Sequence, residues 1–367
     1  AQQQLQAEWQ QCKRKLIVVG QSNLDQNLCQ QLEEFSQQQQ IPLVADIISN
    51  FHSVESAIKH PDVFLGKDAS KLLQPDLLIT FGLSVISKNL KIFLRKYHPQ
   101  AHWHIQPGGR AADTFQSLTR ILPTAPKFFF QLAKGWSENP HDTYYKDWQT
   151  AETQAVRKVV DFFNSSENQV SEFYVVAAVL KNLPQRSSLH LANSMAVRYA
   201  NLIGLPDDHS EVEVIANRGT SGIDGSSSTA VGAALASPDR LHILITGDLA
   251  FFYDRNAFWH NYPLPNLRIV LLNNHGGGIF RMIDGPRRQP ELEEYFETRQ
   301  PLEAENTAKD FGMAYQRINI TQEAASEELT NVLSGFFTGG SQHAKLLEVV
   351  SDSPTNAKVF RQFRFGD

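Results

Sequence analysis

The fold of this chain is decided by LHILITGDLAFFYDRNAF, residues 241–258, together with NLRIVLLNNHGGGIF, residues 266–280. Each segment opens with an apolar run of strand length and ends in polar residues or glycine, which is typical of a buried parallel strand followed by a loop. Similar apolar runs alternate with amphipathic segments along the whole chain, as in parallel sheets with helical crossovers. The sequence therefore predicts an α/β protein built from two doubly wound parallel-sheet domains.

The first part of the chain predicts the smaller of these domains. Its expected strands lie at residues 16–20, 42–46, 77–81 and 103–106. Its expected helices lie at residues 67–73 and 87–97, with a third that starts at an N-cap, Ser22 or Asn23, and runs to residue 40. LIVVGQSN lacks the GxGxxG pattern, so we expect no dinucleotide there.

The second part predicts a further parallel α/β layer. The periodicity fails between about residues 127 and 145, where we place the connection between the domains. The expected helices lie at residues 145–163, 171–183, 226–236 and 323–336, with another that starts at residue 194. The expected strands lie at residues 189–191, 212–216, 241–246, 267–272, 315–318 and 346–350. We thus expect domains at residues 1–135 and 166–367, joined by a connection and linker helix at residues 136–165.

The composition excludes several classes of protein. Of 367 residues, 41% are hydrophobic and 20% are charged, unlike a disordered, collagen-like or coiled-coil chain. The net charge of −5 gives no basis for binding a nucleic acid, so we expect a small-molecule partner. The two cysteines are too few for a disulfide framework and show no metal-ligand spacing. We therefore expect the protein to lie in the reducing cytoplasm. No apolar run approaches the ~20 residues of a membrane span.

Polar residues follow both strands of the deciding segments. Gly247 and Asp248 follow the first, and Asn274 follows the second, 26 positions after Asp248. This spacing allows one strand–helix–strand crossover, so the two side chains can converge at the carboxyl edge of the sheet, where α/β proteins bind ligands. A carboxylate, an amide oxygen and a carbonyl of the glycine run are ligands that Mg²⁺ prefers beside phosphate oxygens. Glycines such as Gly277 also let the backbone approach a diphosphate.

These motifs carry a resemblance to a known family. GDL and NN resemble the signature of thiamine diphosphate (ThDP) enzymes, and NRGTSGIDGSSSTAVGAA at residues 217–234 is similar to one branch of them. That branch is 2-succinyl-5-enolpyruvyl-6-hydroxy-3-cyclohexene-1-carboxylate (SEPHCHC) synthase, a transferase of the carboligase type in menaquinone biosynthesis. The resemblance implies ThDP and Mg²⁺, or Mn²⁺, as cofactors. It also implies a middle domain at residues 1–135 and a diphosphate-binding domain at residues 166–367.

The resemblance implies a metal role for three residues. Asp248 and Asn274 would hold the metal through their side chains, and Gly276 through its carbonyl. Gly247 and Leu249 would line the diphosphate.

The resemblance also implies contacts with the rest of the cofactor. Ser221 would offer its backbone carbonyl to the aminopyrimidine. Ile223 would support the bent conformation of the cofactor.

The substrates of the family, 2-oxoglutarate and isochorismate, are dicarboxylates and need fixed cations. Ser194 and Arg198 stand at i and i+4 on one face of the helix expected after a strand, where Arg198 can grip a carboxylate with two hydrogen bonds. Arg218, directly after another strand, is a second candidate. Lys88 matches a family lysine, although Asn89 stands where the family often has a basic residue.

Two further residues match apolar positions that lie beside the substrate in the family. They are Ile279 and Phe280, at the end of the second deciding segment. Either residue can equally serve the core of the domain.

The reaction implied is decarboxylation of 2-oxoglutarate and addition of the resulting succinyl carbanion equivalent to isochorismate. The family's activating glutamate lies on an N-terminal pyrimidine-binding domain that we do not find here, and AQQQLQAEWQQ at the start looks like a domain boundary. We therefore expect these residues to be inactive alone and the whole protein to be a homodimer or homotetramer. The alternatives are another ThDP-dependent decarboxylase or carboligase, similar to acetolactate synthase, and a non-catalytic module of the ThDP fold.

Overall fold

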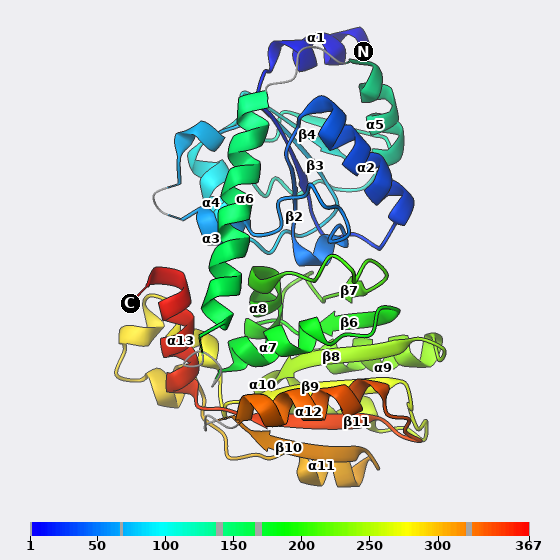
Figure 1. The fold of residues 1–367 in the computed structure, drawn as a ribbon, viewed down its shortest axis with the longest axis vertical. Helices are drawn as coiled ribbons and strands as arrows, with labels where there is room; N and C mark the ends of the chain where they lie inside the picture. Colours follow the sequence, from blue (N-terminus) through cyan, green and yellow to red (C-terminus); the bar gives the residue numbers. More distant parts are fainter. Residues whose placement is uncertain (1, 67–68, 137–141, 166–170, 321–324, 367) are drawn as a thin grey trace. The chain divides into compact units, whose positions relative to one another are not determined.

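The computed structural model describes the chain except for residues 1, 67–68, 137–141, 166–170, 321–324 and 367. It forms two compact units, residues 1–159 and 160–367, and each unit has its own parallel sheet (Figure 1). The predicted α/β fold class is confirmed. The limit between the units lies within α6 (Asp142–Phe163), while the exact domain ranges stay predictions. Among the described residues, no helix has the length and apolar character needed to cross a membrane.

The sheet of the first unit has five parallel strands in the order β2-β1-β3-β4-β5. Their bounds are Lys15–Val19 for β1, Leu43–Ala45 for β2, Leu77–Phe81 for β3, Ala101–Ile105 for β4 and Arg120–Leu122 for β5. The first four lie where the sequence predicts strands. β5 was not predicted, because its sequence RIL has no apolar run and only Leu122 of the three residues is buried.

Helices cover both faces of this sheet. Side chains of β1 alternate between two cores, with Ile17 in the core beneath α2 and α5 and Leu16 in the core beneath α4 and α6. The helices are α1 (Gln2–Gln11), α2 (Gln26–Gln39), α3 (Pro61–Phe64), α4 (Lys88–Lys96), α5 (Pro126–Ala133) and α6. This two-faced burial explains why the strands are continuous apolar runs rather than alternating ones.

Two local predictions in this unit are wrong. The expected helix at residues 67–73 is reduced to a single turn at Lys71–Leu73, capped by Ser70, and residues 67 and 68 lie outside the described part. The N-cap of α2 is Asp25, whose carboxylate accepts from the amide of Leu28 at 3.0 Å. Ser22 does not cap it, because its hydroxyl donates to the carbonyl of Ser49.

The sheet of the second unit has six parallel strands in the order β10-β11-β9-β8-β6-β7. The bounds are Ser187–Leu191 for β6, Glu213–Ile215 for β7, Leu241–Gly247 for β8, Leu267–Asn273 for β9, Ala314–Asn319 for β10 and Lys345–Val350 for β11. All six lie at predicted strands. β8 and β9, the strands of the two deciding segments, are neighbours at the centre of the sheet.

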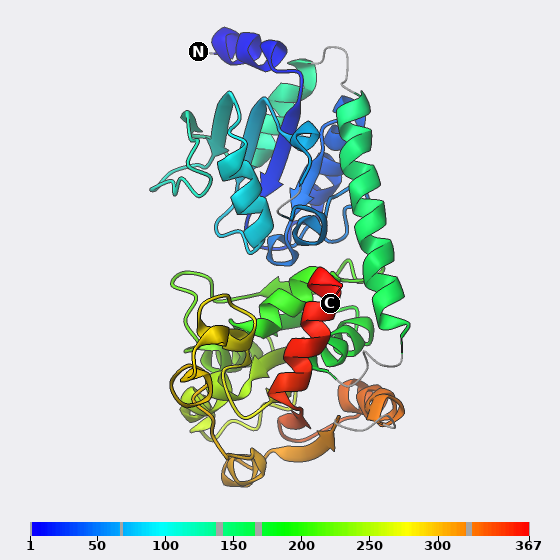
Figure 2. The ribbon, with the colours of Figure 1, turned by 90° about the vertical axis from the view of Figure 1, so that its left-hand side faces the viewer.

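Helices alternate with the strands of this unit along the chain. They are α7 (Glu172–Lys181), α8 (Met195–Ile203), α9 (Ser226–Ala236), α10 (Asp248–Tyr253), α11 (Glu305–Asp310), α12 (Ala325–Thr338) and α13 (Ser353–Phe365). The first residues of the helix predicted at 323–336 lie outside the described part. α13, in red, lies against the turn at Gly278–Arg281 in both ribbon views (Figure 1, Figure 2).

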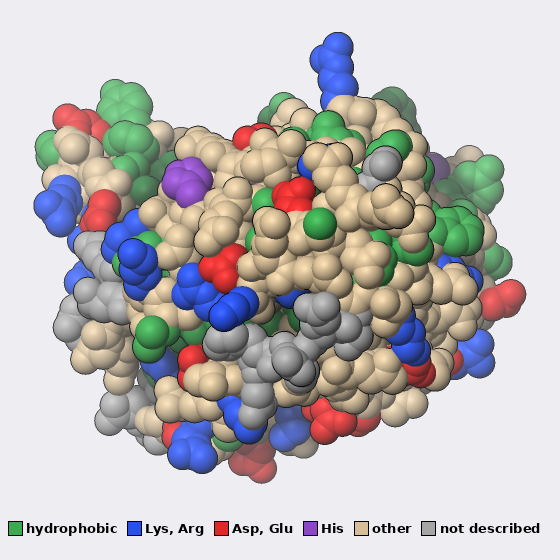
Figure 3. All heavy atoms as spheres, turned by 90° about the horizontal axis from the view of Figure 1, so that it is seen from above, with side chains coloured by type: hydrophobic (Ala, Val, Ile, Leu, Met, Phe, Trp, Pro, Cys, Tyr) green, Lys and Arg blue, Asp and Glu red, His purple; other side chains and the backbone are tan. Residues whose placement is uncertain are grey.

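The surface mixes charges of both signs. On the face drawn in Figure 3, basic, acidic and apolar side chains of the described residues are interspersed. Such interspersion agrees with a chain that has 34 basic and 39 acidic residues.

Candidate functional site

The two deciding motifs meet at one edge of the second sheet. β8 ends at Gly247, which pairs in register with Leu272 of β9. Asp248 is the first residue of α10, and Asn274 directly follows β9. The strands are neighbours, so the condition for their polar ends to converge is met.

Asp248 is a buried carboxylate at this edge, 2% exposed. One oxygen accepts from the amide of Leu249 at 2.8 Å, and the other from the side-chain amide of Gln300 at 2.9 Å. Burial raises the pKa of Asp248 to about 6, although these two hydrogen bonds and one from the Gly276 amide lower it. The hydrogen bonds favour the ionised form of the carboxylate, which is the form that a hard metal ligand must take.

Asn274 presents an unused oxygen. Its Nδ2 donates to Oε1 of Glu172 at 2.7 Å, while its Oδ1 is buried and has no hydrogen-bond partner among the described residues. A buried carbonyl oxygen without a donor is costly, so this atom marks a place for a cation or a donor from a ligand. Burial raises the pKa of Glu172 to about 7, opposed by the hydrogen bond from Asn274.

The glycine run after Asn274 is held close to another loop. A Cβ at Gly276 would lie 2.9 Å from the carbonyl oxygen of Glu297, so a side chain does not fit there. The same oxygen accepts from the amide of Gly277 at 2.7 Å, and the carbonyl of Gly276 accepts from the amide of Gly278 at 3.0 Å. A carbonyl has two lone pairs, so Gly276 keeps one for a ligand.

These residues fit a divalent cation with a diphosphate. Asp248, Asn274 and Gly276 supply a carboxylate, an amide oxygen and a carbonyl oxygen, the hard ligands that Mg²⁺ prefers. The described ranges hold no group of three or more His, Cys, Asp or Glu side chains that could hold a metal, and the predicted set needs only one such side chain. At Gly247 nothing lies within 4 Å of an added Cβ, which leaves space beside the end of β8; Leu249 is half-buried.

The two apolar candidates lie on the turn that follows. Ile279 and Phe280 are half-buried within Gly278–Arg281, and the ring of Phe280 lies 5.8 Å from that of Phe296. A Cβ at Gly277 would lie 3.1 Å from the Phe280 ring, so the absence of a side chain at Gly277 lets this ring lie close to the backbone.

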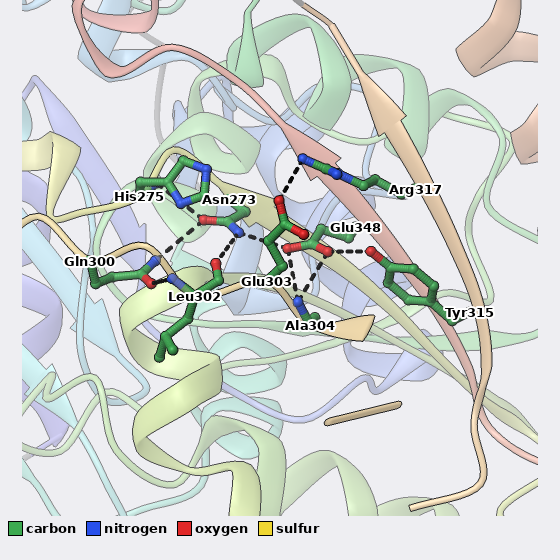
Figure 4. Close-up of polar contacts among 9 residues, drawn as sticks. All are labelled: Asn273, His275, Gln300, Leu302, Glu303, Ala304, Tyr315, Arg317 and Glu348. Carbon is green, nitrogen blue, oxygen red and sulfur yellow. Dashed lines mark hydrogen bonds and ion pairs between the residues drawn. The ribbon is translucent and has the colours of Figure 1, made fainter. Parts of the chain in front are cut away.

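The other asparagine, Asn273, is held by a buried glutamate that sequence reasoning missed (Figure 4). Its Nδ2 donates to Glu348 at 2.7 Å, and its Oδ1 accepts from the amide of His275 at 3.1 Å. Glu348 also accepts from the Tyr315 hydroxyl and the Ala304 amide. A single glutamate inside KLLEVV was the available signal, since a charge in a buried strand needs partners.

A second cluster lies at the end of β6. Arg198 of α8 donates to the carbonyl of Ser194 at 2.5 Å, and Ser194 has φ +73°, a left-handed conformation. Arg218 donates to Oδ1 of Asn193 at 2.6 Å, and Nδ2 of Asn193 donates to the carbonyl of Gly222 at 2.6 Å. Asn193, which was not predicted, precedes Ser194 in the chain and contacts Arg218 through its side chain. It thus links the segments of the two arginines at the end of β6.

The remaining predicted residues lie on two separate elements. Ser221 and Ile223 are exposed in the loop between β7 and α9, where Ser221 has φ +61°. Lys88 is exposed at the start of α4 in the first unit. Asn89 beside it binds Asp62 through its amide and side chain, at 2.7 and 2.8 Å, so it ties α4 to α3.

Two family models match this chain. The model described as "Middle domain of thiamine pyrophosphate" matches residues 1–191. The model described as "Thiamine pyrophosphate enzyme, C-terminal TPP binding domain" matches residues 209–349.

Three proteins that are similar in sequence to this chain share one name. A protein of Cytophaga hutchinsonii named 2-succinyl-5-enolpyruvyl-6-hydroxy-3-cyclohexene-1-carboxylate synthase is 42% identical over 96% of this chain and 61% of its own length. Proteins of the same name from Flavobacterium psychrophilum and Bacteroides thetaiotaomicron are 37% and 36% identical, over 97% and 79% of this chain and 62% and 50% of their own lengths. The chain thus spans about three fifths of the length of the first of these relatives.

Proposed function

The chain belongs to the thiamine pyrophosphate enzymes, in the branch of the SEPHCHC synthases, and from this we propose what the site at the β8–β9 edge binds and what reaction it serves. We propose that it binds ThDP through Mg²⁺ or Mn²⁺. The whole protein would decarboxylate 2-oxoglutarate and add the succinyl unit to isochorismate. A homo-oligomer in the cytoplasm is part of the same proposal.

The observation that carries the cofactor proposal is the oxygen of Asn274, which has no hydrogen-bond partner in the described part of the chain. It lies at the same sheet edge as the buried carboxylate of Asp248, with the carbonyl of Gly276 two residues along the chain. These three residues would hold the metal. Gly247, Leu249 and Gly277 would line the diphosphate. At Gly247 nothing lies within 4 Å of an added Cβ, which leaves room there for the diphosphate oxygens.

Residues of the loop after β7 would act on the organic part of the cofactor. Ser221 would accept from its amino group, and Ile223, which is 39% exposed, would pack against its rings. When bound, ThDP supplies an electron sink that stabilises the charge left by loss of CO₂. The chain's own residues bind, orient and shield the reactants.

The arginines support the choice of substrate. Arg198 and Arg218 are joined through the Ser194 and Asn193 segment, so two guanidinium groups are anchored at one strand end. A dicarboxylate such as 2-oxoglutarate needs fixed cations of this kind, whereas pyruvate has a single carboxylate. Lys88, Ile279 and Phe280 complete the proposed substrate contacts.

The test compares two substrates in the intact protein with ThDP and Mg²⁺. We expect decarboxylation of 2-oxoglutarate to exceed that of pyruvate, and Arg198→Ala or Arg218→Ala to raise the KM for 2-oxoglutarate at least about tenfold. Arg186→Ala is the matched control, because that arginine is exposed and pairs only with Glu211 at 3.7 Å among its described contacts.

Two results would contradict the proposal. Equal or faster decarboxylation of pyruvate would favour another ThDP decarboxylase or carboligase. Absence of both ThDP binding and decarboxylation in the intact protein would favour a non-catalytic module.

A further inference from the structure

We propose that Glu172, the first residue of α7, is a positioning residue that orients the amide of Asn274 with its oxygen toward the metal. The inference rests on the proposed function, because it assumes that Asn274 is a metal ligand. Glu172 lies 102 positions before Asn274 in the chain and belongs to no motif of the sequence analysis.

The contact itself is short and buried. Oε1 of Glu172 accepts from Nδ2 of Asn274 at 2.7 Å, and Glu172 is 2% exposed. The same Oε1 accepts from Nδ2 of Asn274 and from the hydroxyl of Ser351, so it is the nitrogen end of the amide that faces Glu172. The oxygen of Asn274 is then left facing away from Glu172, and it is this atom that has no partner among the described residues.

Glu172 is itself fixed by neighbouring residues. Its backbone amide donates to Oδ1 of Asn356 at 2.9 Å, and the hydroxyl of Ser351 donates to Oε1 at 3.1 Å. Nδ2 of Asn356 in turn donates to Ser351 at 2.9 Å. The end of β11 and the first turns of α13 thus hold the carboxylate in one place.

Helix capping does not account for this glutamate. The N-cap of α7 is Ser171, whose hydroxyl accepts from the amide of Tyr174 at 3.3 Å. The Glu172 side chain instead points to Asn274 and Ser351. A buried carboxylate is costly when only neutral donors face it, so stability alone would favour an apolar residue here.

The neighbouring asparagine shows what an orienting glutamate does without a metal. Asn273 also gives its Nδ2 to a buried glutamate, Glu348, but its oxygen is taken by the amide of His275. Both amides donate their nitrogen to a buried glutamate, and among the residues that the structure describes only the oxygen of Asn273 has a donor. Residues behind metal ligands commonly set ligand orientation in this way.

The test measures Mn²⁺ binding in the intact protein with saturating ThDP, by following free Mn²⁺ with electron paramagnetic resonance. Glu172→Leu removes the acceptor, so we expect Mn²⁺ to bind at least about tenfold more weakly. Glu172→Gln keeps an acceptor oxygen and the shape, so we expect affinity within about threefold of the wild type. This pair separates orientation from charge.

A matched control reports on folding. Tyr315→Phe removes a hydroxyl donor from the other buried glutamate, Glu348, in the same unit. We expect it to lower the melting temperature without changing the affinity for Mn²⁺. Melting curves of all variants show whether Glu172→Leu is folded; if it is not, the Gln variant and Glu172→Met, which also lacks an acceptor, supply the same comparison.

The outcomes separate the inference from the proposed function. Weak binding by the variant that lacks an acceptor, with near-normal binding by Glu172→Gln, supports the positioning role. Equal affinity in all variants overturns it while the proposed function stands, and equal weakening by Leu and Gln overturns it in favour of a charge effect. No Mn²⁺ binding by the wild type overturns both.

Discussion

The adjacent asparagines Asn273 and Asn274, at the end of β9, differ in the hydrogen bonding of their side-chain oxygens. Asn273 is fully buried, and both ends of its amide are used within the protein. Asn274 donates from its nitrogen, and its oxygen finds no donor within the described ranges. The difference comes from what surrounds each side chain, because the two residues are chemically identical.

The burial of Asp248 predicts that the proposed metal binding depends on pH. Its pKa is about 6 in the folded protein, above its ordinary value of 3.8, so the metal-free unit loses stability as pH rises through about 6 and the buried carboxyl ionises. Mg²⁺ needs the ionised form, so its affinity changes in the opposite direction. We predict a fall of about tenfold per pH unit below pH 6.

Calorimetric titration with Mg²⁺ at about pH 7.5, 6 and 5, in the presence of ThDP, measures this dependence. Asp248→Asn is the control, because titration of the ThDP phosphates remains in that variant while titration of Asp248 is lost. An affinity equal at the three pH values, after this correction, would contradict the prediction.

Sequence could predict some residues of the site and not others. Asp248 and Asn274 follow apolar runs at a spacing that fits one crossover, so local pattern identifies both residues, and their convergence needs only that β8 and β9 are neighbours. Glu172, Asn193 and Gln300 act through partners 102, 25 and 52 positions away. No local pattern encodes such pairs, since they exist only once the sheet order is set.

At the scale of elements, the carboxyl ends of β8 and β9 differ in the space that they leave for a side chain. The segment after β9 approaches the loop at Glu297 so closely that glycine is required at residue 276. At Gly247, the last residue of β8, nothing lies within 4 Å of an added Cβ. Its φ of −83° is one that any residue can adopt.

This contrast predicts two different effects of adding a methyl group. Gly276→Ala should destabilise the metal-free protein by about 1–3 kcal/mol, because the Cβ meets a backbone oxygen at 2.9 Å. Gly247→Ala should leave the melting temperature nearly unchanged and weaken binding of ThDP, whose diphosphate would occupy the space. Thermal unfolding without cofactor measures the effect on stability, and titration with ThDP measures the effect on binding. A stable Gly276→Ala variant together with a destabilised Gly247→Ala variant would refute the prediction.

Secondary structure was predictable wherever apolar runs were long. The six strands of the second unit and the helix at residues 226–236 follow the pattern of the sequence. Two elements without such a run were not predicted: β5, in which only Leu122 is buried, and α5 (Pro126–Ala133), most of which lies where the periodicity was expected to fail. At residues 71–73 a serine-capped turn replaced part of the expected helix.

At the scale of the whole molecule, the chain combines two α/β units that match the middle and C-terminal models of thiamine pyrophosphate enzymes. The family signature lies in the second unit, which holds both deciding segments and the arginine cluster. The first unit contributes Lys88 to the proposal. Its strand ends carry no glycine pattern for a dinucleotide, and Asn89 there serves the packing of α4 on α3.

The central claim is that the β8–β9 edge binds ThDP through a divalent metal. The most direct measurement is calorimetric titration of the intact protein with ThDP, with saturating Mg²⁺ and with a chelator in its place. We predict binding that requires Mg²⁺, that is lost in Asp248→Ala, and that is unchanged in the surface control Arg186→Ala. Binding of equal strength without Mg²⁺, or binding that survives Asp248→Ala, would contradict the claim.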